Sequence, residues 1–394
     1  MAVVATGFFD GVHLGHRQVV RTLVSSARER GEEAIVVTFA PHPRAVLQQD
    51  AHTLRLLNSP QEKVAMLRGL GVDRVEVLRF DRAFARLTSA DYIRSILVDR
   101  FGATLLVLGF DNRLGSDRLT PDAIVPLAQS LGLETVIVPP VAPCSKGSAR
   151  QNFASSTPQI ADLRGPRFSL IPPTASQRVP PVHEATGGHG SAGQTLAATP
   201  PEAGDAAIEA VSAVAPENPA TLGMVRGGTA SEAQRWGPKD VFRGELQNCI
   251  AAEVVSSTKI RKALEEGRVE EAEAMLGYAY GLRGVVVSGK QLGRKLGFPT
   301  ANLRLYDPLK LIPGRGVYLT EVEVLGAHYW GMTNVGDIIE THIFDFNEDI
   351  YGLDLEIRFR RWLRPMRSME SLDALKSQLA ADEDACREML SFIK

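Results

Sequence analysis

Short apolar runs and helical repeats alternate along the first 141 residues of the chain. Five apolar runs predict buried strands, at residues 3–5, 35–39, 75–80, 105–110 and 136–138. Helical spacing predicts helices between them, at residues 15–30, after a Ser59–Glu62 capping box, and near residues 89–101 and 121–131. Apolar strands that alternate with helices are typical of a parallel sheet covered on both faces, in which ligands bind at the carboxyl ends of the strands. The segment therefore predicts an α/β domain.

The last part of the chain follows the pattern of a β domain. Two short helices come first, at residues 257–266 and 269–276. Three apolar segments then predict strands, at residues 282–288, 316–325 and 328–334. Apolar and charged residues alternate over residues 353–360, which indicates a half-buried strand, and residues 372–393 have the spacing of a terminal helix. Several strands followed by one helix predict a small closed β-barrel.

Residues 143–244 follow neither pattern. This stretch holds 12 of the 23 prolines and is rich in Ala, Ser, Thr and Gly, and its few aromatic residues are isolated. Such a segment buries too little apolar surface to offset the entropy of ordering it. We expect a disordered insertion within the first domain, and leave open a helix at residues 205–213.

The composition fits a globular protein and argues against nucleic acid and membranes as its partners. Of the 394 residues 44% are apolar, and the net charge of −2 provides no broad positive field for nucleic acid. No apolar run approaches the roughly 20 residues that cross a bilayer. The first apolar run is not preceded by the basic segment that begins a secretory signal. The scattered cysteines Cys144, Cys249 and Cys386 indicate neither a disulfide framework nor a zinc site. We expect a cytoplasmic protein without nucleic-acid or membrane partners.

The sequence FFDGVHLGH, residues 8–16, links the first predicted strand to a helix. Its glycines allow the backbone to approach a ligand closely, and the helix N-terminus suits a phosphate group. His13 and His16 lie at the same point and can donate hydrogen bonds to a phosphate that gains charge during in-line transfer. Two histidines in a surface loop are the alternative interpretation.

A second polar segment, VSSTKIRKAL, spans residues 255–264. It places three hydroxyl groups at a helix start and Lys259 and Arg261 in the first turn. An N-cap followed by a solvated basic face is one interpretation. The other is a phosphate clamp, in which hydroxyls and a guanidinium hold a leaving pyrophosphate.

Together, HxGH and SSTxxR resemble the HxGH nucleotidyltransferase superfamily, and more narrowly the FMN adenylyltransferase module of prokaryotic bifunctional riboflavin kinase/FAD synthetases. Three further segments carry the narrower resemblance: TFAPHPRAVL (38–47), LNSPQEKVAMLRGLGVD (57–73) and LGFDNRLG (108–115), in which Leu114 replaces an expected Phe. The resemblance implies an ATP side formed by Gly7, Phe9, Asp10, His13, His16, Ser257, Thr258 and Arg261. It implies a flavin side formed by Gly109, Asp111, Asn112 and Arg113, with residues 41–43 also contributing to substrate handling.

The same resemblance implies the reaction. The FMN phosphate attacks the α-phosphorus of ATP in line, pyrophosphate leaves, and no covalent intermediate forms. Positioning and charge stabilisation by His13, His16 and Arg261 would carry the catalysis, with Mg²⁺ bridging ATP oxygens.

A third constellation, GVVVSGKQLGRKLGFPTAN, spans residues 284–302 and contains no Walker A loop. A basic hairpin is the plain interpretation. However, Thr300 and Asn302 place a hydroxyl and an amide oxygen two residues apart, which are ligands suited to Mg²⁺. Glu340, at the start of a predicted strand, can accept the proton of a substrate hydroxyl, although a single Glu is more often solvated surface.

With GVY (316–318), TNVG (333–336), ETHIFDF (340–346) and DIYG (349–352), this segment resembles the riboflavin kinase module. The resemblance implies that Glu340 activates the riboflavin 5′-hydroxyl and that Thr300 and Asn302 bind Mg²⁺, other divalent metals being left open. It implies an ATP site formed by Gly289, Lys290, Gly293, Lys295, Gly297, Pro299, Thr300 and Asn302.

The chain departs from this family before Glu340. Only Asp337, Ile338 and Ile339 separate Gly336 from Glu340, where the family carries a longer loop that helps to enclose the kinase site. A site that does not close admits water and is less preorganised.

We therefore expect an adenylyltransferase domain over residues 1–280, interrupted at 143–244, and a riboflavin kinase barrel over residues 281–394. The substrates and products would be ATP, riboflavin, FMN and FAD, and the oligomeric state is left open. Two alternatives remain: an FMN adenylyltransferase with an impaired barrel, and a non-catalytic flavin-binding regulatory protein.

Overall fold

The structure, a computed structural model, describes residues 1–47, 54–142, 254–289 and 292–391. The expected insertion at residues 143–244, with the helix left open at 205–213, lies outside the described residues.

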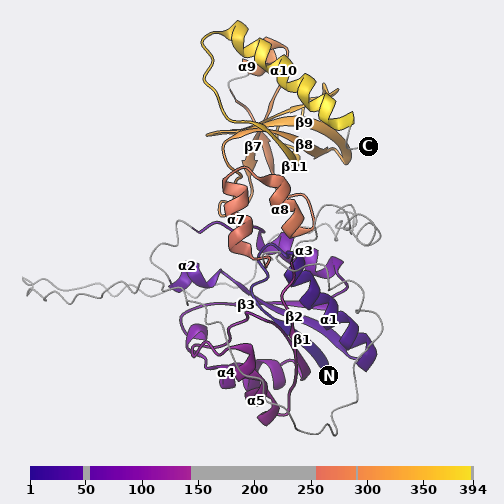
Figure 1. The fold of residues 1–394 in the computed structure, drawn as a ribbon, viewed down its shortest axis with the longest axis vertical. Helices are drawn as coiled ribbons and strands as arrows, with labels where there is room; N and C mark the ends of the chain where they lie inside the picture. Colours follow the sequence, from indigo (N-terminus) through magenta and orange to yellow (C-terminus); the bar gives the residue numbers. More distant parts are fainter. Residues whose placement is uncertain (48–53, 143–253, 290–291, 392–394) are drawn as a thin grey trace, which may run out of the picture. The chain divides into compact units, whose positions relative to one another are not determined.

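The N-terminal part is built on a five-stranded parallel sheet (Figure 1). The strand order is β3-β2-β1-β4-β5, so the chain starts at the centre and builds outward on both sides. The five predicted strands are confirmed as β1 (Ala2–Thr6), β2 (Glu33–Ala40), β3 (Arg74–Arg79), β4 (Ala103–Gly109) and β5 (Glu134–Val138). The carboxyl ends of β1 and β4 are neighbours at one edge, which is where the predicted ligand residues begin.

Helices cover both faces of this sheet. Alternate residues of β1 point to opposite faces, so Val3 packs with α1 (Leu14–Arg30) and α3 (Pro60–Gly69) while Val4 packs with α5 (Pro121–Ser130). The predicted capping box is confirmed at α3, with Glu62 N donating to Ser59 Oγ at 3.1 Å and Ser59 N donating to Glu62 Oε2 at 2.9 Å. Two short elements complete this part, α2 (Pro43–Leu47) and η2 (Phe84–Arg86).

The predicted helix at residues 89–101 is shorter and wider than expected. It begins as α4 (Ser89–Asp91) and continues as a π-helix, η3 (Tyr92–Val98). The wider turn keeps Tyr92, Ile93 and Leu97 buried against the sheet, and the Tyr92 hydroxyl is 2.7 Å from Thr6 Oγ1.

The C-terminal part is a closed antiparallel barrel with strand order β10-β7-β6-β11-β8-β9. Its strands are β6 (Gly281–Val287), β7 (Ala301–Leu305), β8 (Gly316–Val324), β9 (Ala327–Val335), β10 (Ile339–Ile343) and β11 (Asp354–Arg364). Helices α7 (Ser257–Glu265) and α8 (Val269–Leu276) precede the barrel in the chain, and α9 (Leu292–Leu296) and α10 (Leu372–Ser391) belong to it. The predicted barrel and terminal helix are confirmed. Strand β7 was not predicted, because it is short and directly follows Pro299 and Thr300.

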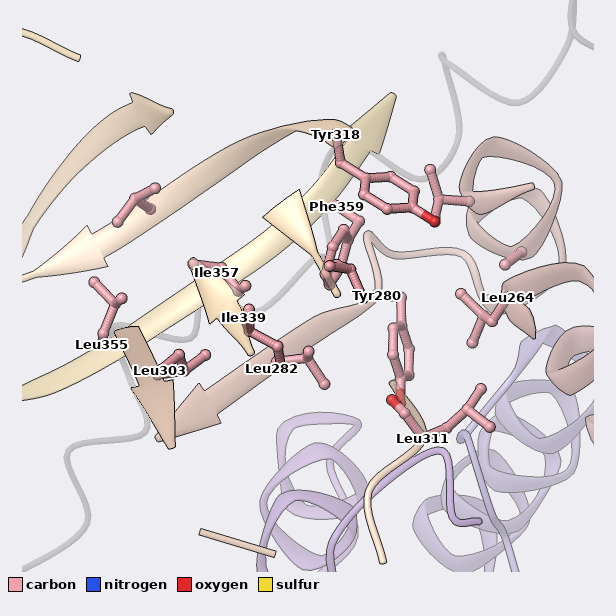
Figure 2. Packing of buried hydrophobic residues seen from close by; sticks show 14 of the residues in the cluster. Leu264, Tyr280, Leu282, Leu303, Leu311, Tyr318, Ile339, Leu355, Ile357 and Phe359 are labelled. Atoms are coloured by element: carbon pink, nitrogen blue, oxygen red, sulfur yellow. The ribbon is translucent and has the colours of Figure 1, made fainter. Parts of the chain in front are cut away.

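The barrel interior is filled by aliphatic and aromatic side chains (Figure 2). Leu355, Ile357 and Phe359 are fully buried, which confirms the predicted alternation from the start of β11 onward, whereas Leu353 lies before the strand and is 37% exposed. The Phe359 ring packs edge-on against Tyr318 with centroids 5.1 Å apart. Side chains of α7 and α8 belong to the same cluster, so these helices are anchored by barrel residues.

Helix α10 is fixed to the outside of the barrel by a buried charge pair. Asp382 is 3% exposed and accepts hydrogen bonds from Arg364 Nε at 2.8 Å and Nη2 at 2.6 Å. Gln378 Nε2 donates to the same carboxylate at 2.8 Å. All the groups are paired, so the contact fixes the helix in one orientation.

We expect Asp382→Ala to lower the free energy of unfolding of the barrel by about 3 kcal/mol, because it leaves the half-buried Arg364 guanidinium without its partner. Thermal unfolding followed by circular dichroism measures the change. Asp384→Ala, which removes an exposed carboxylate from the same helix, is the control. Equal midpoints for the two variants would contradict the assignment.

Candidate active sites

The loop between β1 and α1 has an unusual backbone. Phe9 and Val12 have positive φ angles of 51° and 35°, which non-glycine residues rarely adopt. Gly11 has φ of 84°, and a Cβ there would lie 2.7 Å from Leu57 Cδ1. A loop with two such residues persists only where its surroundings fix it.

Side chains from the following helix and from distant parts of the chain hold the carbonyl groups of this loop. Ser257 Oγ donates to Asp10 O at 3.0 Å, and the Tyr278 hydroxyl donates to Gly11 O at 2.8 Å. Arg17 Nε donates to Val12 O at 3.2 Å. The predicted SSTxxR segment therefore lies against the HxGH loop, although 241 positions separate Ser257 from His16 in the sequence.

Asp10 connects three segments. Its buried carboxylate accepts hydrogen bonds from Leu57 N at 3.0 Å and Asn58 N at 3.2 Å. Arg261 Nη2 donates to the same carboxylate at 2.5 Å, and Arg261 Nε donates to Arg55 O at 3.0 Å. These contacts fix the Arg261 guanidinium at the mouth of the loop.

His13 and His16 are neutral side chains at the start of α1. Their rings stack with centroids 3.6 Å apart, and His13 Nδ1 accepts from His16 N at 3.4 Å, which caps the helix. Burial, together with the Arg261 charge, lowers the pKa of His13 to about 4, and burial also lowers the pKa of His16. Because Nδ1 of neutral His13 is an acceptor, its proton lies on Nε2, from which it can be donated to a ligand.

These residues line a cavity of about 400 Å³. It brings together every residue predicted for the ATP and flavin sides: Gly7, Phe9, Asp10, His13, His16, Ser257, Thr258 and Arg261, with Gly109, Asp111, Asn112 and Arg113. Asn112 Nδ2 also donates to Thr6 O at 2.7 Å, which ties the flavin-side loop to β1.

The cavity is also lined by residues that the sequence analysis assigned to neither side, among them Phe110 and Arg44. The prediction of a buried strand over residues 105–110 was wrong at its last residue: β4 ends at Gly109, and Phe110 is 41% exposed. Both Phe110 and Arg44 follow the carboxyl ends of sheet strands, β4 and β2, and that position is the signal that could have identified them.

The predicted kinase residues meet across three barrel strands. Glu340 on β10 pairs in register with Asn302 on β7 and with Asn334 on β9. Paired residues of neighbouring strands have side chains on the same face, so the three form a row of polar groups. Asn334 Oδ1 is buried and has no hydrogen-bond partner among the described residues. In the sequence analysis Asn334 is only part of the TNVG motif and has no role of its own.

Two glycines pack closely against this row. A Cβ on Gly289 would lie 2.1 Å from Asn302 Nδ2, and a Cβ on Gly293 would lie 2.3 Å from Phe298 O and 3.2 Å from Thr300 Oγ1. Pro299 O accepts from His342 Nδ1 at 2.8 Å, which holds the approach to β7. The neutral oxygen donors of Thr300 and Asn302, with Glu340 beside them, fit a hard divalent cation.

The other residues predicted for the kinase site lie in the segment before β7. Lys295 is exposed on α9, and Gly297 ends that helix with φ of 90°. Lys290 lies outside the described residues. The short connection before Glu340 is a turn of residues 336–338, closed by Gly336 N donating to Ile338 O at 3.2 Å.

The family model described as FAD synthetase matches residues 1–150, and the model described as riboflavin kinase matches residues 276–390. The chain is 27% identical over 395 residues to the bifunctional riboflavin kinase/FMN adenylyltransferase of Listeria monocytogenes, covering 98% of this chain and 91% of that protein. It is 27% identical over 402 residues to the protein of the same name from Escherichia coli K12, covering 100% and 94%.

A solved structure from Streptococcus pneumoniae, described as a macrolide-efflux protein, matches with a TM-score of 0.66 and 26% identity over 98% of this chain and 93% of that one. In the part of the chain that the structure describes, no helix is long and apolar enough to cross a membrane.

Fold, sites and comparisons define a two-domain protein in which an FAD synthetase domain precedes a riboflavin kinase domain. The chain belongs to the family of bifunctional riboflavin kinase/FMN adenylyltransferases.

The pKa of His13 predicts a pH dependence of stability. An unfolded histidine has a pKa of about 6.5, so as the pH falls the unfolded chain takes up this proton first. Neutral His13 therefore favours the folded state above about pH 6.5, and this contribution is lost as the pH falls towards 4. We expect His13 alone to account for a loss of up to about 3 kcal/mol, which His13→Gln removes, while the lowered pKa of His16 leaves part of the dependence in place.

Urea unfolding of the N-terminal domain at about pH 7 and about pH 4.5 measures this loss. His328→Gln, at an exposed position on β9, is the matched control and should keep the wild-type dependence. The same loss in wild type and His13→Gln would contradict the prediction.

Proposed function

We propose that the chain is a two-site enzyme that makes FAD from riboflavin and two molecules of ATP. The C-terminal domain phosphorylates riboflavin to FMN, and the N-terminal domain transfers AMP from ATP to FMN and releases pyrophosphate. The observation that carries this proposal is the single cavity lined by the HxGH loop, the SSTxxR helix and the flavin-side loop. The two family models and the names of the relatives agree with it.

For adenylyl transfer, we assign His13 and His16 to binding the α-phosphate of ATP, which is transferred. An oxygen of the FMN phosphate attacks the α-phosphorus, and the bond to the β-phosphate oxygen breaks. The neutral imidazoles donate hydrogen bonds as negative charge develops. Arg261, held by Asp10, and the hydroxyls of Ser257 and Thr258 would hold the departing pyrophosphate.

In the same cavity, Gly109, Asp111, Asn112 and Arg113 would hold the flavin, and Gly7 and Phe9 would shape the ATP side. Positioning two phosphates against each other in a shared cavity is the main contribution that such a site can make.

For riboflavin phosphorylation, we assign Glu340 as the base that accepts the proton of the 5′-hydroxyl. Thr300 and Asn302 would hold Mg²⁺, which supplies charge neutralisation to the ATP phosphates. Gly289, Gly293 and Gly297 would let the backbone of the segment approach these phosphates, with Pro299 fixing its end and Lys290 and Lys295 adding positive charge. Support comes from the register that sets Glu340 beside Asn302 and from the space left by the glycines.

We further propose the domain limits 1–280 and 281–394 and a cytoplasmic location. The turn at residues 336–338 favours a second candidate function, an FMN adenylyltransferase whose barrel phosphorylates riboflavin slowly. Incubating the protein with Mg·ATP and either riboflavin or FMN, and identifying the products, decides between the two. A protein that makes neither product would instead fit the non-catalytic flavin-binding alternative.

Glu340→Gln should abolish FMN formation from riboflavin, because the amide cannot accept the proton, and should leave FAD formation from supplied FMN unchanged. Chromatographic product analysis measures both. Glu348→Gln, an exposed position beyond β10, is the control. Loss of both activities in Glu340→Gln would refute separate sites.

Deleting residues 143–244 should preserve FAD formation from FMN. Val255 N donates to Val141 O at 3.1 Å, so the described residues on either side of this stretch already meet. The nine residues that remain between Gly244 and Val254 are long enough to join two such close ends. A collapse of adenylyl transfer, measured as pyrophosphate release, would show that the deleted segment takes part in the site.

A further inference from the structure

Lys63, on the first turn of α3, is a buried cation behind the adenylyltransferase cavity. It is 4% exposed. Its Nζ donates to Phe8 O at 3.0 Å and to Thr38 Oγ1 at 2.9 Å, and Thr38 Oγ1 donates to Phe8 O at 3.2 Å. Both partners of the ammonium are neutral oxygens, so they satisfy its hydrogen bonds without cancelling its charge.

The carbonyl that Lys63 holds lies at the start of the strained loop. Phe8 directly precedes Phe9, the residue with φ of 51°. The Lys63 ammonium also lies 4.3 Å from the centroid of the Phe8 ring. The centroids of the Phe8 and His42 rings are 3.9 Å apart. One side chain thus fixes both the backbone and the ring of a residue that lines the cavity.

The charge of Lys63 reaches the cavity. Burial lowers the pKa of His16 and of His42, both of which line it, and the Lys63 charge lowers both further. Burial lowers the pKa of Lys63 itself to about 8, while the Asp10 carboxylate acts in the opposite direction. A fixed positive charge behind a phosphate site stabilises negative charge without reorganisation during the reaction.

We propose that Lys63 is a positioning residue for adenylyl transfer: it holds the Phe8 carbonyl, and with it the loop that carries His13, and it places a buried positive charge behind the phosphates. The proposal rests on the proposed function of the N-terminal domain. Lys63 is not among the residues that line the cavity, so it acts through Phe8 and through its field.

The test compares Lys63→Met, Lys63→Gln and Lys63→Arg in the full chain, with FMN and Mg·ATP as substrates. Lys63→Met keeps the apolar stem and removes charge and donors, Lys63→Gln keeps a donor, and Lys63→Arg keeps the charge. Arg68→Met, which removes an exposed cation from the same helix, is the matched control. We expect kcat for FAD formation to fall at least about tenfold in Lys63→Met, with a smaller change in KM for FMN, and to be partly restored in Lys63→Arg.

Three results would overturn the proposal. The first is wild-type kcat in Lys63→Met, and the second is a loss confined to KM. The third is an equal loss in all three variants with a lowered thermal midpoint, because Lys63 would then only support the fold. If wild type itself makes no FAD from FMN, the proposed function fails instead, so the two failures are distinguishable.

Discussion

The loop of residues 7–13 is the constraint on which the N-terminal site depends. Two non-glycine residues in it have positive φ angles, and the loop keeps this shape because partners from elsewhere in the chain bind its carbonyls. Lys63, Ser257, Tyr278 and Arg17 come from four separate helices or segments. The loop cannot form its site before these segments have packed, so the site is a product of the folded domain and not of the motif alone.

The same contacts explain why α7 packs against both the loop and the barrel. Ser257 and Arg261 contact the loop on one side, while Ile260, Ala263 and Leu264 join the hydrophobic cluster of the barrel. An apolar stripe that packs against the barrel thus fixes the opposite, polar stripe of the same short helix. Burial of the apolar stripe provides the stabilisation that a nine-residue helix cannot provide alone.

Much of the fold followed from the sequence, because apolar periodicity records which side of an element is buried. It predicted all five sheet strands and most of the alternation of β11, and the Ser59–Glu62 spacing predicted the α3 capping box. It failed where periodicity is weak: β7 has five residues, and the π-helix over Tyr92–Val98 has the apolar content of an ordinary helix. The motifs predicted the lining of the cavity, but Lys63 was hidden, since a single Lys in a helix gives no sign that it is buried. Asn334 was hidden likewise, because strand register decides that it lies beside Glu340.

The two sites differ in how they are built. In the N-terminal site a strained loop, two stacked neutral imidazoles and a paired Arg261 surround a cavity, so its electrostatics are fixed before any substrate binds. In the barrel, regular strand pairing holds Glu340, Asn302 and Asn334. The turn before Glu340 is short and consists of residues 336–338. Strand register fixes the positions of these side chains, and of the three Asn302 is buried while Glu340 remains partly exposed. The barrel row therefore depends more on its substrates, and on the segment that carries Gly289 and Gly293, to complete its surroundings, whereas the N-terminal site depends on the packing of its own chain.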